Sequence, residues 1–352
     1  MHSTHFGFTA RQRGSVIVLV LALVTLASFF LSQFIERSMT EMLVESRVRQ
    51  AERLRADAHS ALEASLAVLA EYQAIDDGLH APVQGWGAPL DGLDFVIRAG
   101  TTVAVAIEDE SGRISLPRMS ERELVMLGRQ LGLKEAEAGR LADALLTWTR
   151  KDHVPTRIET DPRNYEYEDP PHHPPGRPIA SFDELAAIAG AREFFYTPEG
   201  RPTRLQEDFA GSVSLYSFPA ANLNSAKPAT LMLAGLDEGQ VRKIAAYQAG
   251  LGSRPAGAPA YFRSVAEAQS LLGIVVPPDR FDTLARCLRL RVTVREGGTA
   301  FHLTAVVAPV ANARGETGAA AGETLPAGPE LRYPFQLLAF EENIELAPSP
   351  AL

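Results

Sequence analysis

The fold of this chain is decided by RQRGSVIVLVLALVTLASFFLSQFI, residues 11–35. From Ser15 to Ile35 the stretch holds 21 residues without a charge, enough for a helix to cross roughly 30 Å of hydrocarbon. Arg11 and Arg13 precede it, and the positive-inside rule therefore keeps residues 1–14 in the cytoplasm. The sequence predicts a single-pass membrane protein whose bulk lies on the far side of the membrane.

Two simpler interpretations of this segment are a cleaved secretory signal and an uncleaved signal anchor. A cleaved signal needs a short apolar core with a small-x-small site after it. Here the run continues into Gln33-Phe34-Ile35-Glu36-Arg37 without such a site. The sequence therefore favours a segment that stays attached to the mature chain, and a plain anchor remains an alternative.

Composition bounds the rest of the chain. The 352 residues are enough for two domains, and 46% hydrophobic residues are ample for packed cores. The net charge of -9 and the lack of a basic patch argue against a general nucleic-acid binder. A single cysteine, Cys287, excludes an intrachain disulfide, and its apolar neighbours predict a buried thiol.

The N-terminal helix should continue to about Ile75, because no Gly or Pro follows Gly14 until Gly78. Beyond the membrane segment, apolar residues recur at three- and four-residue spacing, which predicts one buried stripe that a sheet must cover. The stripe comprises Leu54, Ala58, Leu62, Leu66, Leu69 and Tyr72.

Strand signals lie in two groups that are far apart in the chain. Residues 94–98 and 101–107 are joined by Ala99-Gly100, which predicts a hairpin. Residues 288–295 alternate strictly, and Glu296-Gly297-Gly298 turns the chain into a partner strand at 300–307. A last strand is expected at 335–340, after a Gly/Ala/Pro-rich stretch at 311–329 that predicts a flexible loop.

Helical signals fill the region between these groups, from about Ser120 to Ala285. A capping box at Ser120-Glu121-Arg122-Glu123 predicts one helix, and Leu141, Leu145 and Trp148 mark the next. Another short helix is expected to start at Ser181. The order of signals predicts a helical domain inserted into a sheet domain.

Residues 222–244 have the pattern of a helix-hairpin-helix, with Gly235 closing the turn. Such hairpins often present backbone N–H groups to a DNA phosphate. The turn here reads Ala234-Gly235-Leu236-Asp237, where a DNA binder usually has Gly-hydrophobic-Gly, and the Asp237 carboxylate would repel phosphate. The pattern therefore favours a structural hairpin over a DNA-binding one.

The segment from Asp152 to Pro178 contains seven prolines and six acids, which predicts a long irregular loop. Its carboxylates are hard oxygen ligands of the kind that Ca²⁺ binds, while the alternative is a solvated acidic loop. The adjacent His172 and His173 lack other spaced ligands and do not indicate a transition-metal site. The chain shows no nucleophile, zinc or phosphate-binding motif, so binding and assembly are favoured over an enzyme.

Several segments, in their order along the chain, resemble those of one family. They are Arg13-Gly14-Ser15, which resembles a prepilin cleavage junction; Glu108-Asp109-Glu110-Ser111-Gly112-Arg113-Ile114-Ser115-Leu116; Trp148 with Asp152; Arg177-Pro178-Ile179-Ala180-Ser181-Phe182-Asp183-Glu184-Leu185; Asn222-Leu223-Asn224-Ser225-Ala226; and the C-terminal hairpin. Together they resemble general secretion pathway protein K, the large minor pseudopilin of type II secretion systems, over nearly the whole chain.

The resemblance implies an α+β, type IV pilin-like fold, with a long N-terminal helix on an antiparallel sheet. It also implies a large inserted all-α domain containing the helix-hairpin-helix-like segment. The expected parts are a prepilin leader at 1–14, the transmembrane part of the N-terminal helix at 15–35, the first part of the pilin-like domain at 36–115, the inserted α-helical domain at 116–285 and the second part of the pilin-like domain at 286–352.

The implied function is that of a minor pseudopilin in the inner membrane, with most of its chain in the periplasm. Prepilin peptidase would cut after Gly14 and methylate Ser15. The mature protein would join two other minor pseudopilins in a hetero-trimeric tip complex that initiates and caps the pseudopilus for export of folded proteins. Further implied partners are the major pseudopilin, the secretin and the secreted substrates.

Site residues follow from this resemblance. We expect the membrane anchor to include Val16, Leu19, Leu23 and Phe30, and the partner-binding helix to include Leu54, Leu62, Leu66 and Leu69. Most pilins have Glu at the fifth mature position, which is Leu19 here. A buried charge without its partner costs several kcal/mol, and a subunit at the tip has no neighbour above it to supply one.

Calcium is the implied cofactor, because the family binds Ca²⁺ in its helical domain. The acid-rich stretch around the family's Trp is replaced here by Thr147-Trp148-Thr149-Arg150-Lys151. We expect the ligands to come instead from the following segment. They are Asp152, Asp161, Glu166, Glu168 and Asp169.

Two other functions remain open from the sequence. A membrane-anchored DNA-binding protein of competence type would use the hairpin at 222–244, whose Asn-Leu-Asn start those proteins share. A minor pilin of a true type IV pilus would use the same N-terminal helix, but the large helical insertion favours secretion.

Overall fold

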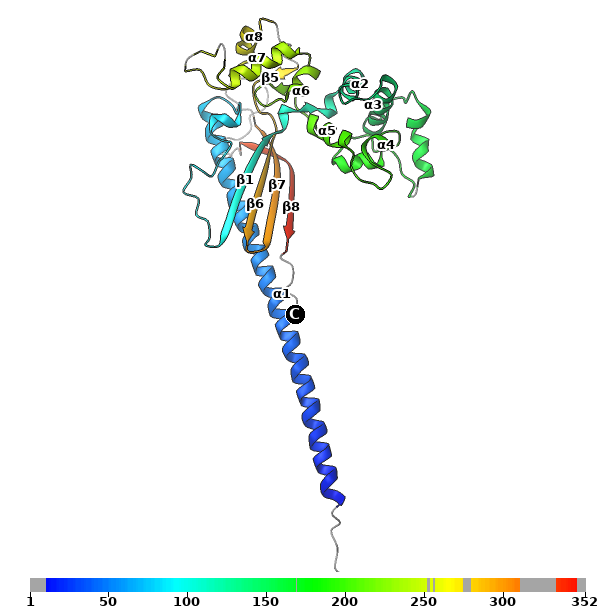
Figure 1. The fold of residues 1–352 in the computed structure, drawn as a ribbon, viewed down its shortest axis with the longest axis vertical. Helices are drawn as coiled ribbons and strands as arrows, with labels where there is room; N and C mark the ends of the chain where they lie inside the picture. The colour runs from blue at the N-terminus through cyan, green and yellow to red at the C-terminus, as the bar shows by residue number, and fades with distance from the viewer. Residues whose placement is uncertain are drawn as a thin grey trace, which may run out of the picture.

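A single helix, α1 (Arg11–Ile75), forms the spine of the molecule (Figure 1). The computed structural model describes residues 11–168, 170–251, 254–255, 257–274, 280–310 and 334–346, with side chains from Val16 onward. At 1.5 Å per residue the 65 residues of α1 extend about 97 Å. The helix stops just before Asp77, which has a φ of 55°, so the predicted length of this helix is confirmed.

Four antiparallel strands form a sheet against the second half of α1 (Figure 1). They are β1 (Thr101–Asp109), β6 (Leu288–Glu296), β7 (Thr299–Pro309) and β8 (Phe335–Glu345), in the order β1-β6-β7-β8. Gly297, with a φ of 60°, forms the tight turn between β6 and β7. This hairpin and the last strand are confirmed, and β8 runs five residues beyond the predicted end at 340.

The strand predicted at 94–98 is wrong. These residues are irregular, and β1 pairs with β6 instead of with them. Phe95 packs on the core between α1 and the sheet, Val96 is 91% exposed, and Arg98 forms an ion pair with Asp57 of α1. Side-chain contacts with α1 thus override the β propensity of this segment.

The core of this part lies between α1 and the inner face of the sheet. Leu54 and Leu69 of α1 are fully buried, as are Leu290 and Val292 of β6. The polar residues between them on β6 point away from this core, which explains the strict alternation in the sequence. Burying one such Leu or Val contributes roughly 1.5–3 kcal/mol, so this contact holds helix and sheet together.

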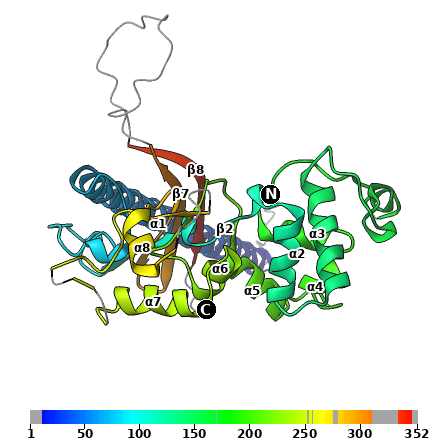
Figure 2. The ribbon, with the colours of Figure 1, turned by 90° about the horizontal axis from the view of Figure 1, so that it is seen from above.

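The chain leaves the sheet after β1 and returns at β6, and the segment between them forms two helical groups (Figure 2). One group contains α2 (Glu121–Gln130), α3 (Glu135–Thr149), α4 (Arg192–Phe195) and α5 (Arg204–Ser212); the other contains α6 (Pro228–Leu233), α7 (Glu238–Gln248) and α8 (Val265–Leu272). Each group has its own apolar core. The capping box at Ser120 and the buried positions of Leu141, Leu145 and Trp148 are confirmed.

Two short parallel strand pairs connect these groups to the rest. β2 (Ile114–Ser115) pairs with β3 (Val213–Ser214), and β4 (Ala221–Asn222) pairs with β5 (Phe281–Asp282). The boundaries of the inserted domain, 116 and 285, stay predictions.

The acidic, Pro-rich segment is more regular than predicted. It contains two short 3-10 helices, η4 (Ile158–Thr160) and η5 (Pro162–Tyr167). Asp161 accepts a hydrogen bond from the Arg163 N–H at the start of η5, and Pro162 fits the first position of a helix, where its missing N–H costs nothing. The helix expected from Ser181 is also 3-10, η6 (Phe182–Ala187), while the loop predicted at 311–329 lies outside the described residues.

Candidate functional site

The first half of α1 is an apolar helix with no cover from its own chain (Figure 1). It is the one helix in the described part of the chain that is long and apolar enough to cross a membrane. The predicted anchor residues Val16, Leu19, Leu23 and Phe30 lie here, each more than half exposed. Gly14 and Ser15 lie in the same helix, near its first described residue.

The exposed apolar surface continues beyond the uncharged run. It consists of Met39, Met42, Leu43, Val44 and Val48, each more than half exposed. Charged residues share this stretch as pairs one turn apart, Arg37 with Glu41 at 3.5 Å and Arg49 with Glu45 at 2.5 Å. We call residues 39–48 the collar; they are the part of α1 above the uncharged run that is free to meet another helix.

The prediction that Leu54, Leu62, Leu66 and Leu69 bind partner subunits is wrong. The exposed fraction of these side chains is 6% or less, because the sheet of the same chain covers them. The periodicity correctly indicated a buried stripe, but the sheet of the same chain buries it and no partner subunit is needed. The collar takes over as the candidate partner surface.

Asp109, a half-buried residue, links the end of β1 to the second helical group. Its Oδ1 accepts hydrogen bonds from the N–H and the hydroxyl of Ser111, and its Oδ2 accepts from Ser225 and, at 2.7 Å, from the Asn222 amide. Asn222 also donates to the His80 carbonyl at 2.9 Å. The Asp109 carboxylate thus receives several donors, which a buried charge requires.

Asn224 extends this junction toward the segment before α8 and the residue that follows β5. Its amide donates to the carbonyls of Phe262 and Thr283, at 2.9 and 3.0 Å, and its oxygen accepts from the Phe262 N–H at 2.7 Å. Leu223, between the two asparagines, lies in the apolar core of the second group. The Asn-Leu-Asn pattern is therefore a structural link between segments that are distant in sequence.

Glu110, next to Asp109, is almost completely buried and is neutralised by two arginines. Its carboxylate accepts from Arg289 of β6 at 2.6 Å and from Arg113 at 3.0 Å. Gly112 follows, and a Cβ there would lie 2.8 Å from the carbonyl oxygen of Ser225. The acidic turn and the Asn segment, which are far apart in the sequence, thus form one packed junction.

The helix-hairpin-helix-like segment is confirmed as a helical hairpin, formed by α6 and α7. Gly235, with a φ of 111°, lies between the helices. The Asp237 carboxylate accepts a hydrogen bond from the Gln240 N–H at 2.9 Å and so occupies the N-terminus of α7. A phosphate at this helix end would meet a carboxylate already in place.

The five carboxylates predicted to bind calcium do not come together in the described structure. Asp161 pairs with Arg163 at 2.6 Å, and Glu168 pairs with Arg192 at 2.8 Å. Asp152 and Glu166 are exposed, and Asp169 lies outside the described residues. Among described residues no group of three carboxylate, His or Cys side chains could hold a metal ion. The carboxylates described here do not fit a calcium site.

The first helical group contains a buried carboxylate that no sequence pattern predicted. Asp143 of α3 accepts from the Thr156 N–H at 3.1 Å and from the Thr160 hydroxyl, and it contacts His153 at 2.8 Å. Although burial opposes ionisation, these hydrogen bonds lower the pKa of Asp143. Protein donors therefore satisfy this carboxylate.

Two further segments of the resemblance also meet in space. The Trp148 Nε1–H donates to the Glu184 carboxylate at 3.3 Å, and Arg177 pairs with the same carboxylate at 3.1 Å. His172 packs edge-on against the Trp148 and Tyr165 rings. The Trp148 and Arg177-to-Leu185 segments thus serve the packing of the first helical group.

A long helix with an exposed apolar half, packed along an antiparallel sheet, is a type IV pilin-like fold. In sequence, residues 111–197 match the family model for Type II secretion system (T2SS), protein K. This match confirms the resemblance to protein K of type II secretion systems that the sequence shows. No curated protein matches the chain.

The fold is also similar to a solved structure, "The Crystal Structure of the GspK-GspI-GspJ complex from enterotoxigenic Escherichia coli Type 2 Secretion System". The TM-score is 0.59 at 15% sequence identity, and the match covers 86% of this chain and 99% of the other. This similarity confirms the α+β pilin-like fold.

The Asp109 junction predicts a particular pH dependence of stability. Burial raises the pKa of Asp109, against the hydrogen bonds from Ser111, Ser225 and Asn222. The folded protein then holds this proton more tightly than the unfolded chain, so stability falls as pH rises from the unfolded-state pKa through the folded-state pKa. Asp109→Asn cannot ionise, and we expect its unfolding free energy to decline less than that of the native chain between about pH 4 and 7.

Urea unfolding of the detergent-purified full chain across this range measures the effect. The control is Asp91→Asn, which removes an exposed carboxylate. Parallel curves for Asp109→Asn and the native chain would contradict the assignment.

Calcium binding stays a prediction, on the resemblance alone. If the segment at 152–169 reorganises to bind Ca²⁺, the thermal unfolding midpoint should be higher in millimolar CaCl₂ than in EDTA. The double variant Asp152→Asn/Glu166→Gln, which removes two exposed carboxylates, should lose that difference. Equal midpoints of the native chain in CaCl₂ and EDTA would contradict the prediction.

Proposed function

We propose that this protein is a minor pseudopilin that joins two other minor pseudopilins in the complex that initiates and caps the periplasmic pseudopilus. It acts by binding and assembly and has no chemistry of its own. The observation that carries the proposal is the free half of α1, an anchor that continues without interruption into an apolar collar.

The collar gives a physical reason for association. Its apolar side chains lie beyond a run that already suffices to cross the hydrocarbon, so they are exposed to water or interfacial polar groups in the isolated subunit. Packing against similar helices would remove this surface from water. The similar solved structure is of a complex that contains three proteins, GspK, GspI and GspJ, which supports partners of the same kind here.

Leu19 supports a position at the tip. The fifth mature position is an uncharged, exposed residue on the anchor helix. A carboxylate there would need a cationic partner from a subunit above it, and Leu removes that need. The subunit can therefore occupy the end of the filament without leaving an unpaired buried charge.

Orientation and processing complete the proposal. Arg11 and Arg13 keep the leader cytoplasmic, and prepilin peptidase cuts after Gly14 and methylates Ser15. The sheet and both helical groups then lie in the periplasm, near the secretin and the exported proteins. The major pseudopilin follows beneath this subunit in the filament.

Leader processing is the first expectation. Mass spectrometry of the membrane-extracted chain should find a mature N-terminus at methylated Ser15 only in cells that have prepilin peptidase. Gly14→Leu should leave the leader intact, while Gly7→Leu, the same change elsewhere in the leader, should be processed normally. An intact native leader in cells with the peptidase would contradict the proposal.

The collar should hold the tip complex together. Leu43→Asp introduces a charge into an apolar contact, so we expect at least a tenfold loss in co-purification of the other minor pseudopilins from detergent-solubilised membranes. Ser60→Asp adds the same charge at an exposed polar position of α1 outside the collar and should retain them. Equal recovery with Leu43→Asp and the native chain would show that the collar is not the partner surface.

A further inference from the structure

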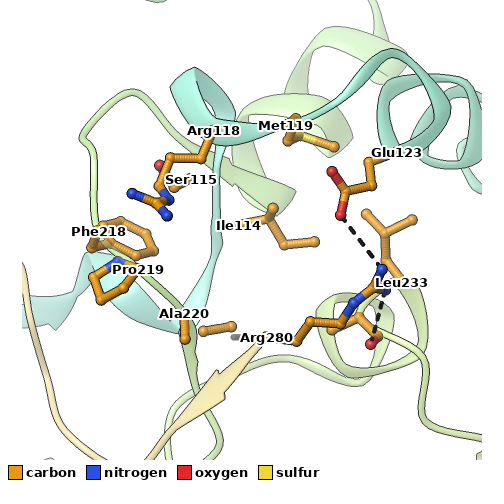
Figure 3. A pocket seen from close by; sticks show the side chains of 12 residues that line it. Ile114, Ser115, Arg118, Met119, Glu123, Phe218, Pro219, Ala220, Leu233 and Arg280 are labelled. Carbon is orange, nitrogen blue, oxygen red and sulfur yellow. Dashed lines mark hydrogen bonds and ion pairs between the residues drawn. The ribbon is translucent and has the colours of Figure 1, made fainter. Parts of the chain in front are cut away.

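A pocket of about 260 Å³ lies where the first helical group meets β2 and α6 (Figure 3). Its apolar side chains include Ile114, Met119, Phe218 and Leu233, of which the last three are buried. This volume is below the roughly 300–1,000 Å³ of small-molecule sites. The pocket is therefore suited to one or two side chains of a peptide.

Two arginines border this apolar surface. Figure 3 shows the side chains of Arg118 and Arg280 reaching in from opposite sides, with Ile114 between them. Arg118 is exposed, and within the described part of the chain no ion pair or hydrogen bond engages its guanidinium. In a chain with a net charge of -9, this is a local positive site.

Arg280 is only loosely held. Its Nη2 lies 3.9 Å from the Glu123 carboxylate, and its Nη1 lies 3.5 Å from the Ala234 carbonyl oxygen. Glu123 is committed to the start of α2, where it accepts from the Ser120 N–H at 2.8 Å and the Ser120 hydroxyl at 2.7 Å. A better-placed carboxylate could therefore take the Arg280 guanidinium without breaking a close pair.

The place of the pocket in the fold indicates the source of such a carboxylate. β2, α2 and α6 lie beyond the end of the sheet that is opposite the free half of α1 (Figure 1). The pocket is thus remote from the collar, where helices of other subunits are expected to pack. In a subunit at the tip, this end faces away from the membrane, toward the proteins awaiting export.

We propose that this pocket binds a peptide segment of an exported protein, in which an acidic side chain lies next to an apolar one. The apolar side chain enters between Ile114, Met119 and Phe218, and the carboxylate pairs with Arg118 and Arg280. The source of the peptide rests on the proposed function, whereas the recognition chemistry rests on the pocket itself.

Binding is tested with a fluorescein-labelled synthetic octapeptide that has Leu-Asp-Leu-Glu at its centre, added to the detergent-purified full chain. The double variant Arg118→Glu/Arg280→Glu should weaken the dissociation constant at least tenfold, and binding by the native chain should weaken as salt rises. Arg122→Glu, an exposed charge reversal on α2 outside the pocket, should bind like the native chain. A peptide with Asn and Gln in place of Asp and Glu should bind the native chain weakly.

Equal binding to the native chain and the double variant would overturn the recognition chemistry. The thermal unfolding midpoint of each variant identifies any loss caused by misfolding, and Arg118→Lys/Arg280→Lys should restore part of the binding. The proposal would also be overturned if neither the native chain nor the folded Lys variant bound the peptide.

The source is tested in cells with a photo-crosslinking amino acid in place of Pro219, an exposed residue that lines the pocket without being one of the two arginines. The expected product is a crosslink to a protein that the same cells release into the medium, and the Arg118→Glu/Arg280→Glu variant should lower that release while the other minor pseudopilins still co-purify. Crosslinks to a sister pseudopilin, or loss of co-purification in the double variant, would overturn the assignment to exported proteins. If the native chain itself does not co-purify with the other minor pseudopilins, the proposed tip complex is contradicted instead. Failure of the tip complex and failure of the peptide site are therefore distinguishable.

Discussion

The contact between α1 and the sheet is the constraint on which the rest of the structure depends. One helix supplies both a candidate membrane anchor and one wall of the core, so its apolar residues serve two different contacts. Where β6 and β7 cover it, side chains such as Leu54 and Leu69 are unavailable to any other molecule. Where the sheet ends, the apolar residues of the same helix are exposed.

The second constraint is the polar junction at the end of β1. Removing the charges of Asp109 and Glu110 from water is costly, and the structure compensates with hydrogen bonds from Asn222 and an ion pair with Arg289. Because these partners come from distant segments, satisfying the carboxylates also fixes how the second helical group sits on the sheet. The pocket with Arg118 begins two residues beyond this junction, so its geometry depends on the same contacts.

Local patterns in the sequence predicted much of the fold, because helix length and strand alternation depend mainly on residues that are close together in the chain. The absence of Gly and Pro set the length of α1, and strict alternation identified β6 and β7. The error at 94–98 arose where Phe95 and Arg98 contact α1, a tertiary effect that propensity cannot express. Likewise, the helical periodicity showed that Leu62 is buried but could not show that the sheet of the same chain buries it. No pattern in a single sequence predicts the contact between Asp109 and Asn222.

The separation of β1 from β6 along the chain has a consequence for the order of folding. Synthesis delivers α1 and β1 first, yet β1 must wait for the entire helical insertion before its pairing strand exists. The helices of the insertion depend mostly on contacts within their own groups, so they can form meanwhile, whereas the sheet is a late, non-local product. Until then the Leu54–Leu69 stripe is exposed, and a newly made chain passes through a stage in which it needs protection from aggregation.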